Sequence, residues 1–225
     1  MGANKAAVAK VVNSTAILIT SIDQAHDHGA AFYDESRQSE DELSFDEVFR
    51  AVWQSVFIPS PAVAALSDQR SKDLNLVPGK YVSTQVRSKY HRDRSNDIKM
   101  IDNSLNCASN LEPGWSIYFT SDSTNATVHA INYGRSRNAT VVSGIAEKEP
   151  LHLDRGNEFL KLSDGSRNNT PAGFYTVFVD LYLLANSRCV SYGLGGFGKW
   201  GSLLSHNRTC SVRHSISQCD WVEAH

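Results

Sequence analysis

The stretch FYTVFVDLYLLANSRCVSYGLGGFGKWGSLLS, residues 174–205, decides the fold class. Its first part carries apolar side chains at helical spacing, so one face can pack on a sheet. A short β-prone segment, Cys189–Tyr192, follows, and the glycine-rich loop Gly193–Gly198 leads into a helix expected near Lys199. In α/β proteins such a loop cradles phosphate, because its N–H groups and the helix dipole favour an anion. A glycine-rich turn without a ligand is an equally good interpretation of the loop alone.

The residues before this stretch repeat the same alternation of strand and helix. Strands are expected at 80–87, 115–120 and 139–142, and helices at about 98–108 and 123–131. Four alternating units predict an α/β fold with a Rossmann-like parallel sheet that helices cover on both faces.

Polar side chains follow the carboxyl ends of these predicted strands. Arg87 and Asp122 each end a strand, and the Gly193–Gly198 loop ends a third. Ligands of open α/β sheets bind at that edge, so these residues form the candidate site. Taken singly, Arg87 also fits a surface salt bridge and Asp122 a helix cap.

The chain before the sheet is predicted to contain two other parts. Residues 1–43 are interpreted as the remnant of a preceding domain and a polar linker, because the strand expected at 15–20 has no partner strand before it. Residues 44–75 form a helical interdomain connection, and 76–225 form the Rossmann-like domain. Asp23, His26, Asp27 and His28 suggest a metal site, but a solvated polar loop is the favoured interpretation.

The helical connection has clear boundary signals. Ser44 and Glu47 form a capping box before an aromatic helical face that extends to Phe57. The run Pro59-Ser60-Pro61 stops this helix and caps the next one, expected from Ala62 to about Arg70.

Composition excludes several classes of protein. The 225 residues are 41% hydrophobic and 20% charged with a net charge of −2, so the chain lacks the basic balance of a nucleic-acid binder. No apolar run approaches the roughly 18 residues of a membrane span, and no targeting signal is visible.

Cysteines and sequons point to the secretory pathway. Four cysteines fit two disulfides, and Cys210 lies close enough to Cys219 to staple the tail; four buried thiols are the alternative. No pair has the C-x-x-C spacing of a zinc site. The chain also contains five Asn-X-Ser/Thr sequons, at Asn13, Asn125, Asn138, Asn168 and Asn207.

Several chemistries lack their sequence signatures. There is no Walker lysine motif, no G-x-S-x-G nucleophile elbow and no clear pair of glycosidase carboxylates. Arginine beside a glycine loop suits a diphosphate, because a forked guanidinium and backbone N–H groups both bind phosphate oxygens.

Three ordered motifs, 81–87, 117–122 and 179–198 with its Gly-Gly-Phe-Gly loop, resemble the donor-binding half of GDP-fucose fucosyltransferases. This superfamily includes the core α1,6-, the nodulation and the protein O-fucosyltransferases. The resemblance covers about Phe45 to Ser205. It implies one half of a GT-B enzyme, lumenal in the Golgi or endoplasmic reticulum, which inverts the sugar and needs no metal or other cofactor. Its implied partners are a nucleotide-sugar donor and a glycan or glycoprotein acceptor.

The resemblance also implies roles for individual residues. Arg87 corresponds to the catalytic arginine that neutralises departing GDP, and Asp122 to an acidic residue near the nucleoside. Asp180 corresponds to a helix aspartate with either a structural or a ligand role. The pyrophosphate loop corresponds to four residues, Gly195, Gly196, Phe197 and Gly198.

The chain departs from the family pattern at several positions. Gln85 stands where the family has histidine, Ser88 where a second arginine often follows, and Gly195 and Gly198 where it has serine; Lys199 can add charge. A non-catalytic relative and an unrelated nucleotide-binding α/β protein are therefore the alternatives. His129 and Asp93 are candidate bases, with structural roles favoured for both.

Overall fold

The computed structural model describes residues 45–90, 94–144 and 171–221, and it divides the chain into two compact units, 1–58 and 59–224. In the first unit, helix α2 (Phe45–Val56) presents the predicted aromatic face, on which Trp53 stacks with Phe49 and Phe57. The predictions for residues 1–43, for Ser44 and for 151–169 lie outside the described residues.

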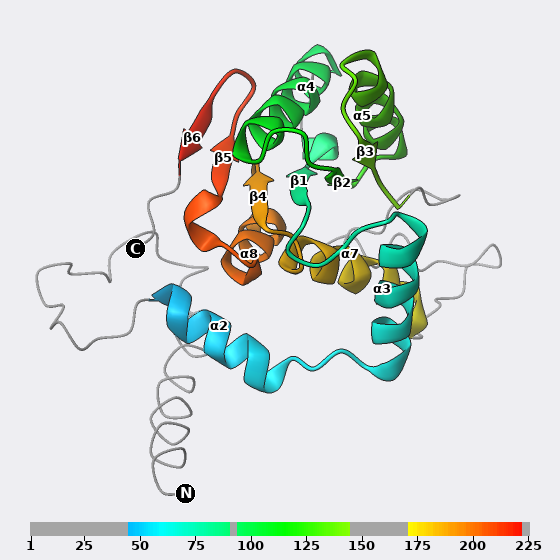
Figure 1. The fold of residues 1–225 in the computed structure, drawn as a ribbon, viewed down its shortest axis with the longest axis vertical. Coiled ribbons are helices and arrows are strands. Elements are labelled where there is room, and N and C mark those ends of the chain that lie inside the picture. Colours follow the sequence, from blue (N-terminus) through cyan, green and yellow to red (C-terminus); the bar gives the residue numbers. More distant parts are fainter. Residues whose placement is uncertain (1–44, 91–93, 145–170, 222–225) are drawn as a thin grey trace, which may run out of the picture. The chain divides into compact units, whose positions relative to one another are not determined.

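The second unit is built on one six-stranded sheet (Figure 1). Its strands are β1 (Val82–Val86), β2 (Ile117–Ser121), β3 (Val141–Val142), β4 (Cys189–Tyr192), β5 (Val212–His214) and β6 (Cys219–Trp221). Their order across the sheet is β3-β2-β1-β4-β5-β6; all neighbouring pairs are parallel except β5 and β6. The predicted parallel α/β sheet is confirmed, and an antiparallel edge strand is added to it.

Helices cover both faces of the sheet, as the alternation predicts (Figure 1). One layer consists of α4 (Arg94–Leu111) and α5 (Thr124–Ser136), and the other contains α3 (Pro61–Asp73), α7 (Tyr175–Ala185) and α8 (Gly196–Leu204). The described residues also form three short 3₁₀ turns: η2 (Ser88–Tyr90), η4 (Pro171–Phe174) and η5 (Arg208–Cys210).

Successive side chains of each strand point to opposite faces of the sheet, so the core consists of two separate clusters. Val82 and Val86 of β1 pack with the α4 side chains Ile101 and Leu105, whereas Tyr118 of β2 packs with Val179 and Leu183 of α7. Because successive strand residues point to opposite faces, both helix layers find apolar partners on the same strands.

Helix boundaries follow local capping chemistry. Ser60 caps α3 as predicted, accepting a hydrogen bond from the Val63 N–H at 3.4 Å. Helix α3 packs on α7 and belongs to the unit that contains the sheet. Helix α8 starts at Gly196 rather than near Lys199, so the last glycines of the loop form its first turn.

Two disulfides fasten the carboxyl-terminal strands. Cys107 of α4 bonds to Cys219 of β6, and Cys189 of β4 bonds to Cys210 of η5. The predicted number of disulfides is confirmed, but the Cys210–Cys219 staple is wrong. Strand β5 lies between Cys210 and Cys219 in the sequence. Cys219 is therefore part of the β5–β6 hairpin, where it lies beside α4.

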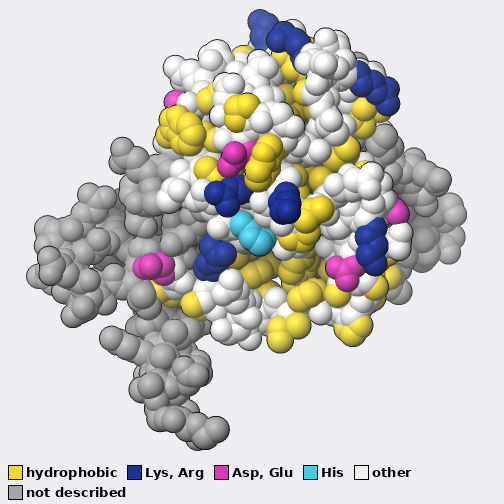
Figure 2. Space-filling model, viewed as in Figure 1, with side chains coloured by type: hydrophobic (Ala, Val, Ile, Leu, Met, Phe, Trp, Pro, Cys, Tyr) yellow, Lys and Arg dark blue, Asp and Glu magenta, His cyan; other side chains and the backbone are white. Residues whose placement is uncertain are grey.

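Surface charge is mixed. On the face in Figure 2, Lys, Arg, Asp and Glu side chains lie singly or in small groups among apolar ones, without a continuous basic stripe. None of the helices in residues 45–90, 94–144 and 171–221 has the length and hydrophobicity that crossing a bilayer requires.

Candidate functional site

The strand order places a topological switch point between β1 and β4. From β1 the chain proceeds outward to β2 and β3, whereas β4 is followed outward in the other direction by β5. The connections that leave the two central strands therefore diverge, which opens a crevice at their carboxyl ends. Arg87 follows β1 at this point, and the glycine loop follows β4.

Arg87 and the glycine loop meet at the switch point. A Cβ atom added to Gly195 would lie 3.5 Å from Arg87 Nη1 and 3.6 Å from its Cδ. Gly195 has a φ of 98°, a conformation that residues with a side chain rarely adopt. The guanidinium thus lies against the loop backbone, as the two motifs predict.

Packing explains two other glycines of this loop. A Cβ on Gly193 would come within 2.7 Å of His214 Nε2, and one on Gly198 within 2.6 Å of Gln85 Oε1. Both side chains lie in strands next to β4, so the loop backbone rests directly on the end of the sheet. Any larger residue at either position would push the loop away from it.

Gly196 is different. It is exposed, its φ is not in the left-handed region, and an added Cβ would meet only the Trp200 ring, at 3.9 Å. Neither conformation nor packing within the described residues requires glycine here. A glycine that the fold does not need, at the start of a helix, is consistent with close approach of a ligand to the backbone.

The amino terminus of α8 directs backbone N–H groups toward the switch point. Gly195 is its N-cap and contributes no capping side chain. The first N–H groups of a helix have no intrahelical partner and carry a partial positive charge. Phe197, in contrast, is half-buried and packs on Leu184, Val190 and Tyr192, so it anchors the loop to the core.

Asp122 organises the turn after β1. Its Oδ1 accepts hydrogen bonds from the Ser88 N–H at 2.7 Å and the Lys89 N–H at 3.2 Å. Helix α5 is capped instead by Ser123, whose hydroxyl accepts from the Ala126 N–H. Asp122 therefore ties the end of β2 to the residues that follow Arg87.

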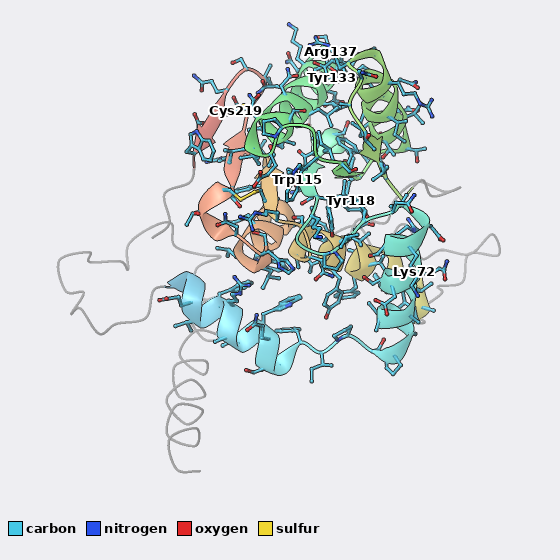
Figure 3. The ribbon with its side chains drawn as sticks, in the orientation of Figure 1. Lys72, Trp115, Tyr118, Tyr133, Arg137 and Cys219 are labelled. Atoms are coloured by element: carbon cyan, nitrogen blue, oxygen red, sulfur yellow. A yellow bond between two sulfur atoms is a disulfide. The ribbon has the colours of Figure 1, made fainter. Side chains whose placement is uncertain are left out.

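Asp180 fastens α7 to the sheet. Its carboxylate accepts hydrogen bonds from Tyr118 Oη at 2.7 Å and Thr120 Oγ1 at 2.9 Å, both from β2; Figure 3 labels Tyr118. Burial raises the pKa of Asp180, although these two hydrogen bonds and the charge of Arg70 act in the opposite direction. These contacts provide the structural role that the sequence leaves open for this residue.

The structure adds buried polar atoms that sequence reasoning missed. Four such atoms have no hydrogen-bond partner among the described residues: Thr84 Oγ1, Gln85 Oε1, Ser211 Oγ and His214 Nε2. They lie on the two strands that flank β4, or next to one of them, and Thr84 and Gln85 point to opposite faces of the sheet. Unpartnered buried polar groups are costly in a stable core and concentrate at functional sites. Strand β5 has three residues, too few to show the alternation typical of a strand. No sequence pattern therefore indicated that His214 would be buried at this edge.

His214 is held under the glycine loop by one hydrogen bond. Its Nδ1 lies 2.8 Å from Ser191 Oγ, and only 3% of the residue is exposed. Burial lowers the pKa of His214 to about 3. The imidazole is thus neutral at physiological pH, and its Nε2 faces Gly193.

Because His214 is buried in its neutral form, we expect the folded protein to lose stability in acid. In the unfolded chain its pKa is about 6.5, so protonation of the unfolded state lowers stability as the pH falls from about 6.5 toward 3. We expect the free energy of unfolding to fall by about 2 kcal/mol between pH 7 and pH 5 from this residue alone. Urea unfolding of the wild type and of His214→Asn, which can keep the bond to Ser191, measures it. In His214→Asn the free energy of unfolding should fall by about 2 kcal/mol less between pH 7 and pH 5 than in the wild type. The control His206→Asn should behave like the wild type. The same pH dependence in all three proteins would contradict the prediction.

The candidate bases are not brought to these buried polar atoms by any described contact. His129 Nε2 lies 2.7 Å from Asp102 Oδ1, which links α5 to α4. Asp93 lies outside the described residues. Among the residues that the structure describes, no three His, Cys, Asp or Glu side chains form a cluster that could hold a metal ion.

The chain matches no protein-family model, and no curated protein is significantly similar to it. The functional interpretation therefore depends on the switch-point geometry and on the motifs themselves.

Proposed function

We propose that this chain is the donor-binding half of a GT-B glycosyltransferase that transfers fucose from GDP-fucose to a glycan or protein acceptor. The observation that carries the proposal is the meeting of Arg87 with Gly195 at the β1–β4 switch point. A cationic fork, a helix amino terminus and an unexplained exposed glycine at one edge suit the diphosphate of a nucleotide sugar.

In this proposal the reaction is a direct displacement with inversion. The acceptor hydroxyl attacks the anomeric carbon of fucose, the bond from that carbon to the phosphate oxygen breaks, and GDP leaves with the bonding electrons. The proton of the hydroxyl passes to a general base. Arg87 and the N–H groups around Gly196 stabilise the charge that develops on the phosphate, which is where preorganised donors lower a barrier most.

The other residues take supporting parts. Asp122 holds the turn that carries Arg87, and this role is compatible with a nucleoside contact through the same carboxylate. Lys199, exposed in the first turn of α8, adds positive charge. Lumenal localisation, in the Golgi or endoplasmic reticulum, is part of the proposal and is supported by the two disulfides, which are typical of oxidising compartments.

One observation favours a second candidate, a relative that binds the donor without turnover. Gln85 occupies the position of the family histidine, is 7% exposed and lies under Gly198. An amide cannot exchange a proton as an imidazole does. Transfer of labelled fucose to a mixture of acceptor glycoproteins separates the enzyme from the binding protein.

Nucleotide-dependent stabilisation tests the shared donor site. We expect GDP and GDP-fucose, but not UDP or ATP, to stabilise the chain by about 2.7 kcal/mol at one hundred times the dissociation constant. Arg87→Ala should abolish that gain, and Arg135→Ala, an exposed arginine on α5, should retain it. Thermal unfolding across a concentration series measures both. An unchanged response of Arg87→Ala would overturn the site assignment, and the absence of a response to guanine nucleotides would overturn donor binding by this chain.

A further inference from the structure

Three of the five sequons lie in the described residues, and they differ in how the fold presents the asparagine. Asn125 is in the first turn of α5, Asn138 follows the end of that helix, and Asn207 precedes η5. A glycan requires an acceptor side chain that the folded protein leaves in solvent, because a branched sugar cannot be accommodated in a core.

Asn125 and Asn138 both meet this requirement, but Thr127, the hydroxyl residue of the Asn125 sequon, is buried. Asn138 is therefore the better acceptor. It is exposed and adopts a φ of 57°, the left-handed conformation that asparagine tolerates at the end of a helix. The Arg137 and Ala139 N–H groups both bond back to α5, to the Tyr133 and Gly134 carbonyls. Backbone hydrogen bonds therefore hold this turn, and the Asn138 side chain is exposed.

Neighbouring side chains leave the acceptor accessible. The Arg137 guanidinium lies over the Tyr133 ring, 5.0 Å from its centroid, and Figure 3 labels this pair at the end of α5. The hydroxyl residue of the sequon, Thr140, is exposed as well. Both parts of the sequon thus face solvent in the folded protein.

Asn207 presents a contrast. Its Oδ1 accepts hydrogen bonds from the Thr209 N–H at 3.2 Å and from Thr209 Oγ1 at 2.8 Å, and the residue is half-buried. Its backbone N–H donates to the Arg188 carbonyl, next to the Cys189–Cys210 disulfide. The fold engages this asparagine instead of exposing it.

We propose that Asn138 carries an N-linked glycan. The disulfides place the chain among proteins of oxidising compartments, where the transfer takes place. The Asn138 amide nitrogen attacks the anomeric carbon of an oligosaccharide held on a lipid diphosphate. A carbon–nitrogen bond forms, the carbon–oxygen bond to phosphate breaks, the lipid diphosphate leaves with the electron pair, and the amide proton passes to a base of the transferase.

Site-specific mass spectrometry tests the proposal. The full chain is directed into the endoplasmic reticulum of eukaryotic cells by a cleavable leader, and the glycans are then released by an amidase in ¹⁸O water. We expect the tryptic peptide 138–148 to contain ¹⁸O-labelled aspartate at position 138 in most molecules. Thr140→Ala, which destroys the sequon without touching the acceptor, should abolish the label, and Thr140→Ser should preserve it. An unlabelled Asn138 in the disulfide-bonded protein overturns the proposal.

Discussion

Gly196→Ala is expected to abolish stabilisation by GDP while leaving the fold of the free protein intact. The new methyl group has room, since it would meet only Trp200 at 3.9 Å, and alanine suits the first turn of a helix better than glycine. A bound phosphate, however, would have to occupy the same space. The wild type should gain about 2.7 kcal/mol at one hundred times the dissociation constant, and the variant close to none. Thermal unfolding with and without GDP measures the two gains.

The control for this experiment lies in the same loop. Leu194 is exposed, and Leu194→Ala removes side-chain atoms without adding any near the α8 N–H groups. It should keep most of the response to GDP. If Gly196→Ala responds like the wild type, phosphate does not bind at the amino terminus of α8, whatever the effect of Arg87→Ala.

Removing the Cys107–Cys219 disulfide should cost more stability than removing Cys189–Cys210. The first bond joins residues 112 positions apart and the second joins residues 21 apart. A cross-link that closes a longer loop removes more entropy from the unfolded chain, which gives losses of about 5 and about 3 kcal/mol. Since a domain has about 5–15 kcal/mol in total, the Cys107→Ala/Cys219→Ala variant should be close to unfolding.

Urea unfolding of both double-alanine variants measures these losses, with the reduced wild type as the reference that lacks both bonds. Using alanine in both pairs keeps the change in side chain the same. Cys107 and Cys189 are both buried, but Cys210 is half-buried and Cys219 is exposed, so packing losses act weakly against the expected order. Equal losses, or a larger loss for the Cys189–Cys210 pair, would show that core packing outweighs loop closure.

Most of the sheet could be predicted from sequence because its central strands are continuous runs of buried residues between turn signals. Strand β4 matches its predicted bounds, and β1 and β2 differ by one or two residues at their ends. Strands β5 and β6 could not be predicted. Each has three residues, too few to show a period of two, and each is fixed by its neighbours: β5 by pairing with β4, and β6 by the hairpin and the bond to Cys107.

Part of the candidate site could be predicted because it follows these central strands. Arg87 and the glycine loop follow strongly patterned strands, so parallel pairing had to bring them to one edge. The partners of Asp122 and Asp180 depend on side-chain directions across strands, which motif order does not specify. The place of His214 and the pairing of the cysteines depend on β5 and β6. Since these two strands could not be predicted, neither feature could be predicted.

The pairing of the cysteines has a consequence for how the chain folds in the cell. Cys107 emerges from the ribosome long before its partner Cys219. In the same way, β1 is synthesised well before β4, the strand that it pairs with at the centre of the sheet. Meanwhile the nearest thiol to Cys219 is Cys210, so proximity alone favours a non-native bond that blocks both native ones. Thiol–disulfide exchange must reverse that non-native bond, which takes minutes to hours without a catalyst. Native material should therefore appear late, after synthesis, and in proportion to the disulfide isomerase present.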